Sequence, residues 1–415
     1  MTDYKRLNTT FLGVKFENPV MLSSSPVSNT GEMVGRSFDA GFGGVVFKTI
    51  GAGKEKIIHP GPRMAGYDYH ADRLVGLQNV EQISDRPMQD NLDDLAWLKK
   101  KWPTKIVVSS IMGFTKKEWR DLAKASQDVG ADMLELNFSC PHMTVEGSGM
   151  KVSHAQALVG EFTAEVKSVV DIPVLAKLTP NITDITETAR FAKDGGADGF
   201  TAINTVQALS GIGLDDFTPR PNVAGKGAMS GYSGPAVKPI GLRCIAQLAQ
   251  AEDLRLPLSG CGGIETWIDA IEYLLVGSGT LQITTGVIHY GYRIIEDILE
   301  GMDLYLQERG LDSVDQLIGR ALPNIVPTDQ FDLKSQGVAD YELDRCVGCG
   351  QCYIICQDAG GQCLAWEDSS RRPVMHEDKC LGCMICSFVC PVASPPMIRY
   401  RVVPGKPEIL PPVMK

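Results

Sequence analysis

The chain has 415 residues, enough for two or three domains, and its 44% hydrophobic and 22% charged content is that of an ordinary globular protein. The formal net charge of −10 argues against nonspecific binding to nucleic acids or anionic membranes, which requires a basic face. The N-terminus lacks the apolar core of a signal peptide, and no apolar run approaches the ~20 residues that span a bilayer. We therefore expect a cytoplasmic protein.

Eight strand-like runs follow one another along the first part of the chain. Each ends in small or polar residues and is followed by a segment that suits a helix, such as 115–130 with its apolar residues at helical spacing. Eight strand–helix units over roughly 300 residues predict an α/β fold of the closed (β/α)8 (TIM) barrel type. A doubly wound sheet is the alternative, but no G-x-G-x-x-G follows the first strand. The eight runs are 18–26, 43–50, 105–113, 132–141, 172–180, 199–205, 256–264 and 280–286.

Two of the connections between these runs are long. They cover 51–86, after the second run, and 207–235, after the sixth, and the latter is rich in glycine. Long loops in a barrel lie at the catalytic rim, so we expect both to shape a substrate pocket.

The cysteines are unevenly distributed. Three of the twelve, Cys140, Cys244 and Cys261, are scattered through the first 340 residues, and the other nine lie between Cys346 and Cys390. Disulfides are rare in a reducing cytosol, so this dense group suggests metal binding.

Two segments in this region, "CVGCGQCYIIC" and "CLGCMICSFVCP", share the spacing C-x2-C-x2-C-x3-C. This spacing is typical of ferredoxins with two [4Fe–4S] clusters, in which the fourth cysteine of each run binds the other cluster. A pair of zinc sites is the alternative, although three closely spaced cysteines suit one corner of a cube better than a zinc ligand pair. Cys363 lies outside both runs and is interpreted as a packing residue. The predicted ligands are Cys346, Cys349, Cys352 and Cys390 for the first cluster, and Cys380, Cys383, Cys386 and Cys356 for the second.

These patterns divide the chain into four parts. We expect the barrel at 1–320, a linker at 321–340, a ferredoxin-like two-[4Fe–4S] domain at 341–400, and an extended, proline-rich tail at 401–415.

The barrel sequence offers features that suit a flavin, the natural converter between one-electron clusters and hydride chemistry. Backbone N–H groups after the seventh and eighth strands can bind a phosphate at the usual barrel position, although both segments could be ordinary tight turns. Lys48 and Lys177 end apolar strands, where each could stabilise a reduced flavin or instead form a salt bridge with a carboxylate on a neighbouring strand. The proposed phosphate contacts are Gly262, Gly263, Thr284 and Thr285.

The segments "LELNFSCPH", "AKLTPNITDI", "GGADGFTAINT" and "SGPAVKPIGLR", followed by the double cysteine run, resemble the dihydropyrimidine dehydrogenase family. The resemblance is strongest to the subunit of the bacterial NAD-dependent enzymes that carries FMN and iron–sulfur clusters. The barrel portion alone is similar to the class 1 dihydroorotate dehydrogenases. The resemblance implies FMN contacts at Ser24 (with Ser23 as a near equivalent), Lys48, Thr49, Lys177, Gly234, Gly262, Gly263, Thr284 and Thr285. It implies substrate contacts at Asn79, Asn137, Phe138, Ser139, Asn204 and Thr205.

Amides suit a pyrimidine base, which offers both carbonyl acceptors and N–H donors, although each asparagine could equally serve as a turn or cap residue. Cys261 stands in the phosphate turn where the family commonly has threonine, so binding there would depend on backbone groups.

Cys140 ends the fourth strand, next to polar residues and a proline. A lone cysteine in such a place is most often a packing residue. Its position at the catalytic end of a barrel strand, together with the family resemblance, favours a reactive role. We expect Cys140 to protonate C5 of uracil or thymine while hydride from FMN reaches C6, since a thiol pKa of ~8.5 is close to working pH.

The loop 142–150 could close over the substrate, and His142 could tune the thiol, contact substrate or lie in solvent.

The expected partners follow from what the chain lacks. It has no recognisable NAD or FAD motif, so electrons from NADH would arrive through a separate flavoprotein subunit. By analogy we expect a homodimer core within a heterotetramer. Two other interpretations stay open: a dihydroorotate dehydrogenase, and an electron carrier whose barrel has lost catalysis.

Overall fold

The computed structural model describes residues 4–52, 57–69, 73–138, 155–332 and 337–403. The chain divides into two compact units, Met1–Asn324 and Ile325–Lys415. No helix in these ranges is long and apolar enough to cross a membrane.

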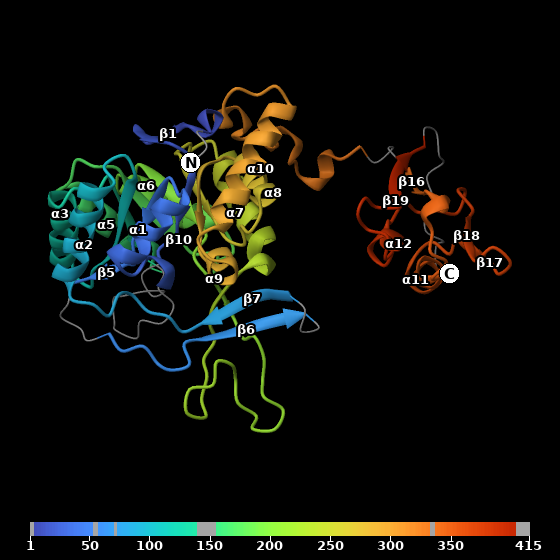
Figure 1. Ribbon diagram of the computed structural model, residues 1–415, viewed down its shortest axis with the longest axis horizontal. Coiled ribbons are helices and arrows are strands. Elements are labelled where there is room, and N and C mark those ends of the chain that lie inside the picture. Colours follow the sequence, from blue (N-terminus) through green and yellow to red (C-terminus); the bar gives the residue numbers. More distant parts are fainter. Residues whose placement is uncertain (1–3, 53–56, 70–72, 139–154, 333–336, 404–415) are drawn as a thin grey trace. The chain divides into compact units, whose positions relative to one another are not determined.

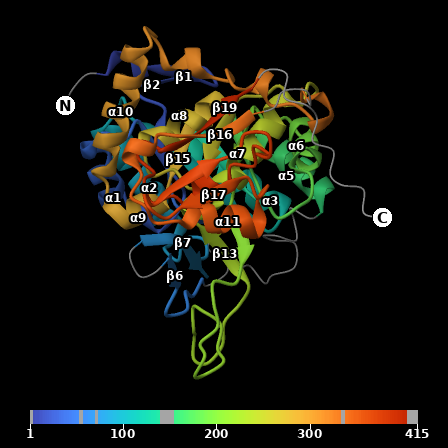
Figure 2. The same ribbon diagram turned by 90° about the vertical axis from the view of Figure 1, so that its right-hand side faces the viewer.

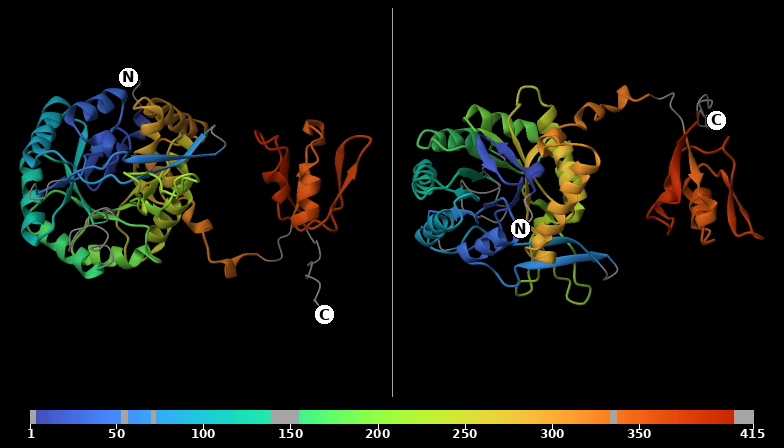
Figure 3. Two further views of the ribbon diagram at one scale, coloured as in Figure 1. Left: turned by 90° about the horizontal axis from the view of Figure 1, so that it is seen from below. Right: turned by 45° about the horizontal axis from the view of Figure 1, so that its top comes forward.

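The first unit is built around a closed barrel of eight parallel strands, which confirms the predicted fold class. Each of the eight predicted runs overlaps a barrel strand, and the pairing of β4 with β8 closes the ring. Figure 3 shows the ring of strands from one end. The strands are β3 (Val20–Leu22), β4 (Gly44–Val46), β8 (Ile106–Met112), β9 (Met133–Asn137), β10 (Val174–Leu178), β11 (Gly199–Ala202), β14 (Leu258–Cys261) and β15 (Ser278–Ile283), and a short strand, β5 (Ile50–Gly51), pairs with β8.

Helices alternate with the strands and cover the barrel from outside (Figure 1). Local sequence favours their starts: Thr115 and Glu118 form a capping box at α3, and Thr266 and Asp269 form another at α8. The helices are α1 (Gly31–Ala40), α2 (Met88–Lys101), α3 (Lys116–Asp128), α5 (Gln156–Lys167), α6 (Ile185–Asp194), α7 (Lys238–Gln250), α8 (Trp267–Leu275), α9 (Thr285–Tyr290) and α10 (Ile294–Glu308). Short 3-10 helices are η1 (Lys5–Leu7), η2 (Pro26–Ser28), η3 (Pro235–Val237) and η4 (Val314–Leu317).

The barrel interior is filled from its N-terminal end. The hairpin of β1 (Thr9–Phe11) and β2 (Val14–Phe16) contributes Phe11 and Phe16, which pack with Met21, Val46 and other inward residues in one buried apolar cluster. Because this end is filled with hydrocarbon, a polar site is confined to the opposite end, where the strands finish.

Two long connections meet at that opposite end. The first supplies β6 (Met64–Tyr69) and β7 (Arg73–Asn79), which pair as an antiparallel hairpin, and the segment after β11 supplies β12 (Val206–Ala208) and β13 (Ser230–Ser233). They pair in the order β12-β13-β7-β6 as a separate antiparallel sheet (Figures 1 and 2). The register sets Asn79 opposite Gly231 and Leu77 opposite Ser233, so these two loops form one wall over the barrel mouth.

The second unit is a small domain with two similar halves. Strand β16 (Gly337–Tyr341) pairs with β19 (Ile398–Val402), and β17 (Leu364–Glu367) pairs with β18 (Arg372–Met375). The helices α11 (Gln351–Ala359) and α12 (Ile385–Phe388) carry cysteines of the two runs. The segment 321–340 was interpreted from sequence as a linker. It contains the short 3-10 helices η5 (Leu322–Asn324) and η6 (Thr328–Gln330) and most of β16. The strand β16 forms there because it pairs with β19, some sixty residues away in sequence. A further turn, η7 (Leu343–Arg345), precedes the first cysteine.

Candidate active site

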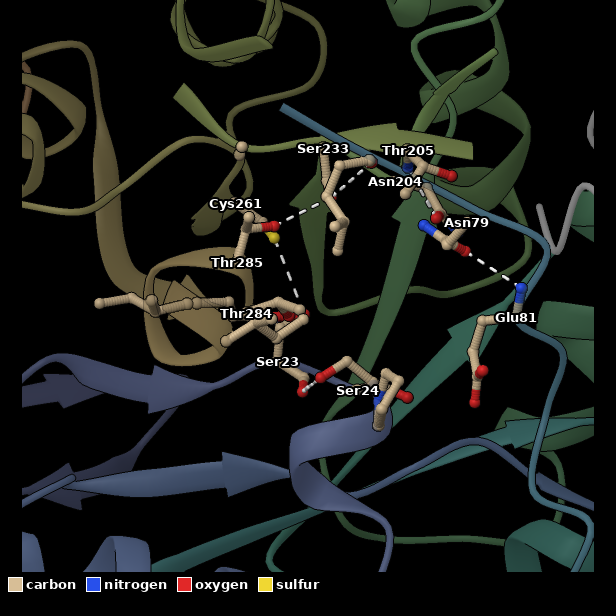
Figure 4. A pocket seen from close by; sticks show the side chains of 18 of the residues that line it. Ser23, Ser24, Asn79, Glu81, Asn204, Thr205, Ser233, Cys261, Thr284 and Thr285 are labelled. Atoms are coloured by element: carbon tan, nitrogen blue, oxygen red, sulfur yellow. Dashed lines mark hydrogen bonds between the residues drawn. The ribbon is translucent and has the colours of Figure 1, made fainter. Parts of the chain in front are cut away.

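A pocket opens at the C-terminal ends of the barrel strands (Figure 4). Its empty volume is about 1030 Å³, part of it open to solvent, which is at the upper end of the range for organic cofactors and substrates. It is lined by residues from seven of the eight barrel strands or the loops that follow them, and by β7 and β13 from the rim sheet. The predicted residues that line it are Ser23, Ser24, Lys48, Thr49, Asn79, Asn137, Lys177, Asn204, Thr205, Gly234, Cys261, Gly262, Gly263, Thr284 and Thr285.

One side of the pocket is formed by three glycines from two segments, Gly234 and the pair Gly262 and Gly263, which are called the glycine cradle below. Gly234, Gly262 and Gly263 have φ values of 100°, 129° and 73°, in the region that favours glycine. A Cβ on Gly263 would stand 2.8 Å from the carbonyl oxygen of Gly234 and 3.0 Å from the backbone nitrogen of Lys238. The cradle therefore leaves backbone groups open to the pocket, as a phosphate requires.

Hydroxyl groups support this cradle from behind and beside it. Tyr273 donates a hydrogen bond of 2.7 Å to the carbonyl of Gly262, and Thr285 Oγ1 donates to Ser233 Oγ at 2.9 Å. Burial raises the pKa of the Cys261 thiol, which stays protonated at neutral pH and lies 3.7 Å from Ser23 Oγ.

Both strand-end lysines reach the pocket, and both have a carboxylate partner. Lys48 Nζ lies 2.7 Å from Glu81 Oε1, at the end of the rim hairpin, and Lys177 Nζ lies 3.1 Å from Glu135 Oε1 on the neighbouring strand β9. Burial opposes the charged form of Lys177, but the charge of Glu135 and its hydrogen bond outweigh burial, so the pKa of Lys177 is raised. From sequence, each lysine was expected either to stabilise a reduced flavin or to form a salt bridge. The salt bridges are present, and both lysines also line the cavity.

A buried polar network extends beneath Lys177. Glu135 is fully buried and accepts hydrogen bonds from Thr201 Oγ1 and Gln282 Nε2, both at 2.8 Å. Lys177 also donates to Ser23 Oγ at 3.2 Å and Gln282 Oε1 at 3.4 Å. Sequence reasoning missed Glu135 and Gln282, although charged or amide residues inside apolar barrel strands are a usable signal.

The predicted substrate amides lie on the other side of the pocket. Asn204 Nδ2 donates to Asn137 Oδ1 at 3.3 Å, and Asn137 Nδ2 donates to Thr49 Oγ1 at 3.0 Å. Thr49 also shares a hydrogen bond of 3.0 Å with Ser24 Oγ. The structure therefore brings the end of β9 and the segments that follow β3, β4 and β11 into one connected polar surface.

Asn79 has a different arrangement (Figure 4). Its Nδ2 donates to the carbonyl of Gly231 at 3.2 Å, and its Oδ1 accepts from the backbone N–H of Glu81 at 3.2 Å. These bonds hold β7 to β13 and fix the segment that carries Glu81, so Asn79 forms part of the pocket wall while its amide stabilises the loop.

Of the predicted residues at the end of the fourth strand, Phe138 is described by the structure. The side chain of Phe138 is 2% exposed and packs against Trp119 of α3, with ring centroids 5.3 Å apart, so it belongs to the core and not to the pocket lining. Ser139 and Cys140 lie outside the described residues, as does His142.

In the cysteine-rich domain, four of the eight predicted cluster ligands lie at one cavity. Cys356, Cys380, Cys383 and Cys386 line one cavity of about 330 Å³. Cys356 belongs to the first cysteine run, on α11, and the other three belong to the second run. No three cysteine, histidine or carboxylate side chains in the described ranges are arranged around a single metal ion. Four cysteine side chains around one cavity suit the thiolate ligation of an iron–sulfur cluster.

The barrel and this domain together define an iron–sulfur oxidoreductase of the (β/α)8 class. Comparison with known families agrees: residues 6–306 match "Dihydroorotate dehydrogenase", and residues 339–397 match "4Fe-4S dicluster domain".

The chain belongs to the dihydropyrimidine dehydrogenase family, within the wider flavin-binding group of the dihydroorotate dehydrogenases. It is 47% identical over 370 residues to the NAD-dependent dihydropyrimidine dehydrogenase subunit PreA of Escherichia coli, covering 89% of this chain and 90% of that protein. It is 36% identical over 329 residues to the chloroplastic dihydropyrimidine dehydrogenase (NADP(+)) of Arabidopsis thaliana, covering 76% and 77%. It is 41% identical over 316 residues to the catalytic subunit of dihydroorotate dehydrogenase B (NAD(+)) of Pyrococcus abyssi, covering 76% and 99%.

These findings confirm the family resemblance, the fold class and an oxidoreductase with iron–sulfur domain. The bacterial relative is a subunit, which indicates that such chains work in multi-subunit enzymes.

Proposed function

We propose that this chain is the catalytic subunit of a dihydropyrimidine dehydrogenase, which reversibly reduces uracil and thymine to their 5,6-dihydro forms. Electrons from NADH would enter through a partner flavoprotein subunit and pass along two [4Fe–4S] clusters to FMN in the barrel. The observation that carries the proposal is the pocket itself, where a glycine cradle and a connected surface of amides face one cavity.

The residues present fit FMN. The cradle of Gly234, Gly262 and Gly263 excludes side chains where a phosphate would bind, and Thr284 and Thr285 begin the short α9 beside it. Lys177 supplies a buried positive charge that can balance negative charge in the cavity. A flavin bound here would supply hydride and could receive electrons singly from iron–sulfur centres.

The protein's own groups would then bind and protonate the base. Asn137 and Asn204 offer both amide donors and carbonyl acceptors, which match the alternating N–H and C=O groups of uracil. Thr205 and Asn79 would complete the wall around the ring. Cys140 Sγ would hold the proton destined for C5, and Ser139 would lie beside it.

Dihydroorotate dehydrogenase activity is the second candidate, favoured by the match over 6–306. Its substrate carries a carboxylate, which calls for a cation. In the described part of the pocket lining the cations are Lys48 and Lys177, the two lysines expected to contact the flavin, so neither is dedicated to a substrate carboxylate. This arrangement favours a neutral pyrimidine.

The experiment is to assay FMN, iron and sulfide on the anaerobically purified chain and then to compare turnover with uracil, thymine and orotate. We expect bound FMN, two [4Fe–4S] clusters per chain, and turnover of uracil and thymine. Faster turnover of orotate would overturn the substrate assignment. Failure of dihydrouracil to bleach the flavin spectrum would instead indicate an electron carrier.

A further inference from the structure

The two halves of the cysteine-rich domain are related residue by residue. Strand β16 ends five residues before Cys346, and β18 ends five residues before Cys380. Strand β17 begins eight residues after Cys356, and β19 begins eight residues after Cys390. Figure 1 labels the four strands and both helices. Each half is therefore a strand, a cysteine run and a second strand.

Backbone hydrogen bonds confirm the correspondence at one position. The carbonyl of Cys363 accepts from the N–H of His376 at 2.8 Å, and the carbonyl of Met397 accepts from the N–H of Glu342 at 3.0 Å. His376 and Glu342 each stand four residues before the first cysteine of a run. Cys363 and Met397 are thus equivalent residues in the two halves, both nearly fully buried.

A second pair follows from strand register. Tyr341 ends β16 opposite Ile398, and Met375 ends β18 opposite Leu364. Since Ile398 and Leu364 are the equivalent first residues of β19 and β17, Tyr341 corresponds to Met375.

Both polar members of these pairs lie at the same cavity. Cys363 and Tyr341 line the cavity formed by Cys356, Cys380, Cys383 and Cys386, the predicted ligands of the second cluster. Cys363 Sγ lies 3.6 Å from Cys356 Sγ. The Tyr341 hydroxyl is completely buried and has no hydrogen-bond partner among the described residues, and Tyr341 lines the same cavity as Cys386.

The loop that carries Cys363 is held against these ligands. Gln362 N–H donates to the carbonyl of Cys356 at 3.2 Å, and Gln357 Nε2 donates to the carbonyl of Leu364 at 2.8 Å. A Cβ on Gly361 would stand 2.8 Å from Leu381 Cγ. The thiol of Cys363 is therefore fixed beside Cys356.

We infer that Cys363 and Tyr341 are positioning residues that donate S–H and O–H hydrogen bonds to the ligand sulfurs of Cys356 and Cys386, and so raise the reduction potential of the second cluster. The inference rests on the proposed two-cluster content. Donors to ligand sulfurs raise the potential because they stabilise the added electron. The thioethers of Met397 and Met375, at the equivalent positions, cannot donate.

The two predicted clusters differ in how far their ligands are exposed to water. Among the predicted ligands of the second cluster, Cys356, Cys380 and Cys386 are buried and Cys383 is exposed, and burial makes added negative charge costlier. Among those of the first cluster, Cys352 is buried, Cys346 and Cys390 are half-buried and Cys349 is exposed, so water reaches more of these ligands. Two protein donors would offset the loss of water at the second cluster and let it accept electrons.

The test is a potentiometric titration of the full-length, anaerobically purified chain, followed by electron paramagnetic resonance. We expect Cys363→Ala and Tyr341→Phe each to lower the same one of the two midpoint potentials, with iron and sulfide content unchanged. Cys363→Ser keeps a donor and should stay close to the unsubstituted potential. Tyr353→Phe, a phenol of α11 outside the cavity lining, should shift neither. The reciprocal change Met397→Cys should raise the other potential.

Unchanged potentials in both Cys363→Ala and Tyr341→Phe would overturn the inference. Loss of one cluster's iron from Cys363→Ala, with Cys363→Ser losing it as well, would also overturn it, because Cys363 would then be a ligand. Absence of two cluster signals from the unsubstituted chain would refute the proposed cofactor content instead.

Discussion

Lys177 Nζ lies 3.1 Å from Glu135 Oε1 at the centre of the barrel, with side chains 6% and 0% exposed. The pair lies directly beneath the candidate flavin pocket, and Gln282 bridges both members. The pair connects the adjacent strands β10 and β9. Lys177 can therefore present a positive charge to a cofactor while Glu135 supplies its counter-charge.

Removing one member should be costly. We expect Glu135→Gln to lower the free energy of unfolding by about 3–5 kcal/mol, because a buried ammonium then lacks its counter-charge. Chemical denaturation followed by circular dichroism measures this. Glu32→Gln, which breaks the exposed pair with Arg36, should cost about 0–1 kcal/mol. Equal costs for the two variants would contradict a buried, charged pair.

The glycine cradle can be tested with two glycines of similar backbone conformation. Gly263 (φ 73°) has carbonyl and backbone atoms within 3.0 Å of a built Cβ, whereas Gly291 (φ 78°) has nothing within 4 Å. Both alanine variants take on a strain of about 1–2 kcal/mol, but only Gly263→Ala should lose FMN affinity, by about tenfold or more. Fluorescence titration of flavin into the flavin-free protein gives the dissociation constants. Similar losses in both variants would argue against a phosphate at this turn.

Cys140 is the proposed proton donor. We expect Cys140→Ala to keep FMN and iron while uracil turnover falls by about 10²–10⁴-fold, the usual contribution of a general acid. Anaerobic assays with uracil, together with flavin and iron analyses, measure both quantities. Cys244→Ala, in the core on α7 away from the pocket, is a matched control that should retain turnover. Full activity of Cys140→Ala would refute the assignment.

His59 gives a prediction about pH. Burial lowers its pKa below the ordinary 6.5 and is reinforced by Lys48 and Arg63, although Glu81 and Asp85 act in the opposite direction. The unfolded chain therefore binds more protons than the folded one between the lowered pKa and 6.5, so stability falls as pH decreases through that window.

Thermal unfolding measured between about pH 5 and pH 7.5 should show this dependence. The variant His59→Gln should have a flatter profile below pH 6.5 and match the unsubstituted chain above it. His376→Gln, at an exposed position, should leave the profile unaltered. A variant of His59 with the full acid sensitivity would contradict the prediction.

Much of the fold was predictable because its signals are local. Every barrel strand lies in a run of apolar residues that ends in small or polar ones, and the carboxyl ends of parallel strands must share one end of the barrel. The candidate pocket residues at those ends, such as Lys48, Asn137 and Gly262, were found for that reason. The side chain of Phe138 packs against Trp119 and does not line the described pocket, because the side-chain direction at a strand end depends on packing.

The sequence by itself determined the order of strands and helices, and it predicted two sets of cysteine ligands and the glycine positions of the pocket, because each depends on spacing along a short stretch of chain. Only the tertiary structure decided which residues meet across long separations. Glu135 pairs with Lys177, the hairpin β6–β7 joins β13, and Cys363 with Tyr341 lies at one cavity while Met397 and Met375 hold the equivalent positions in the other half. Such contacts arise from strand register and chain closure, and these are properties of the packed molecule that no local pattern encodes.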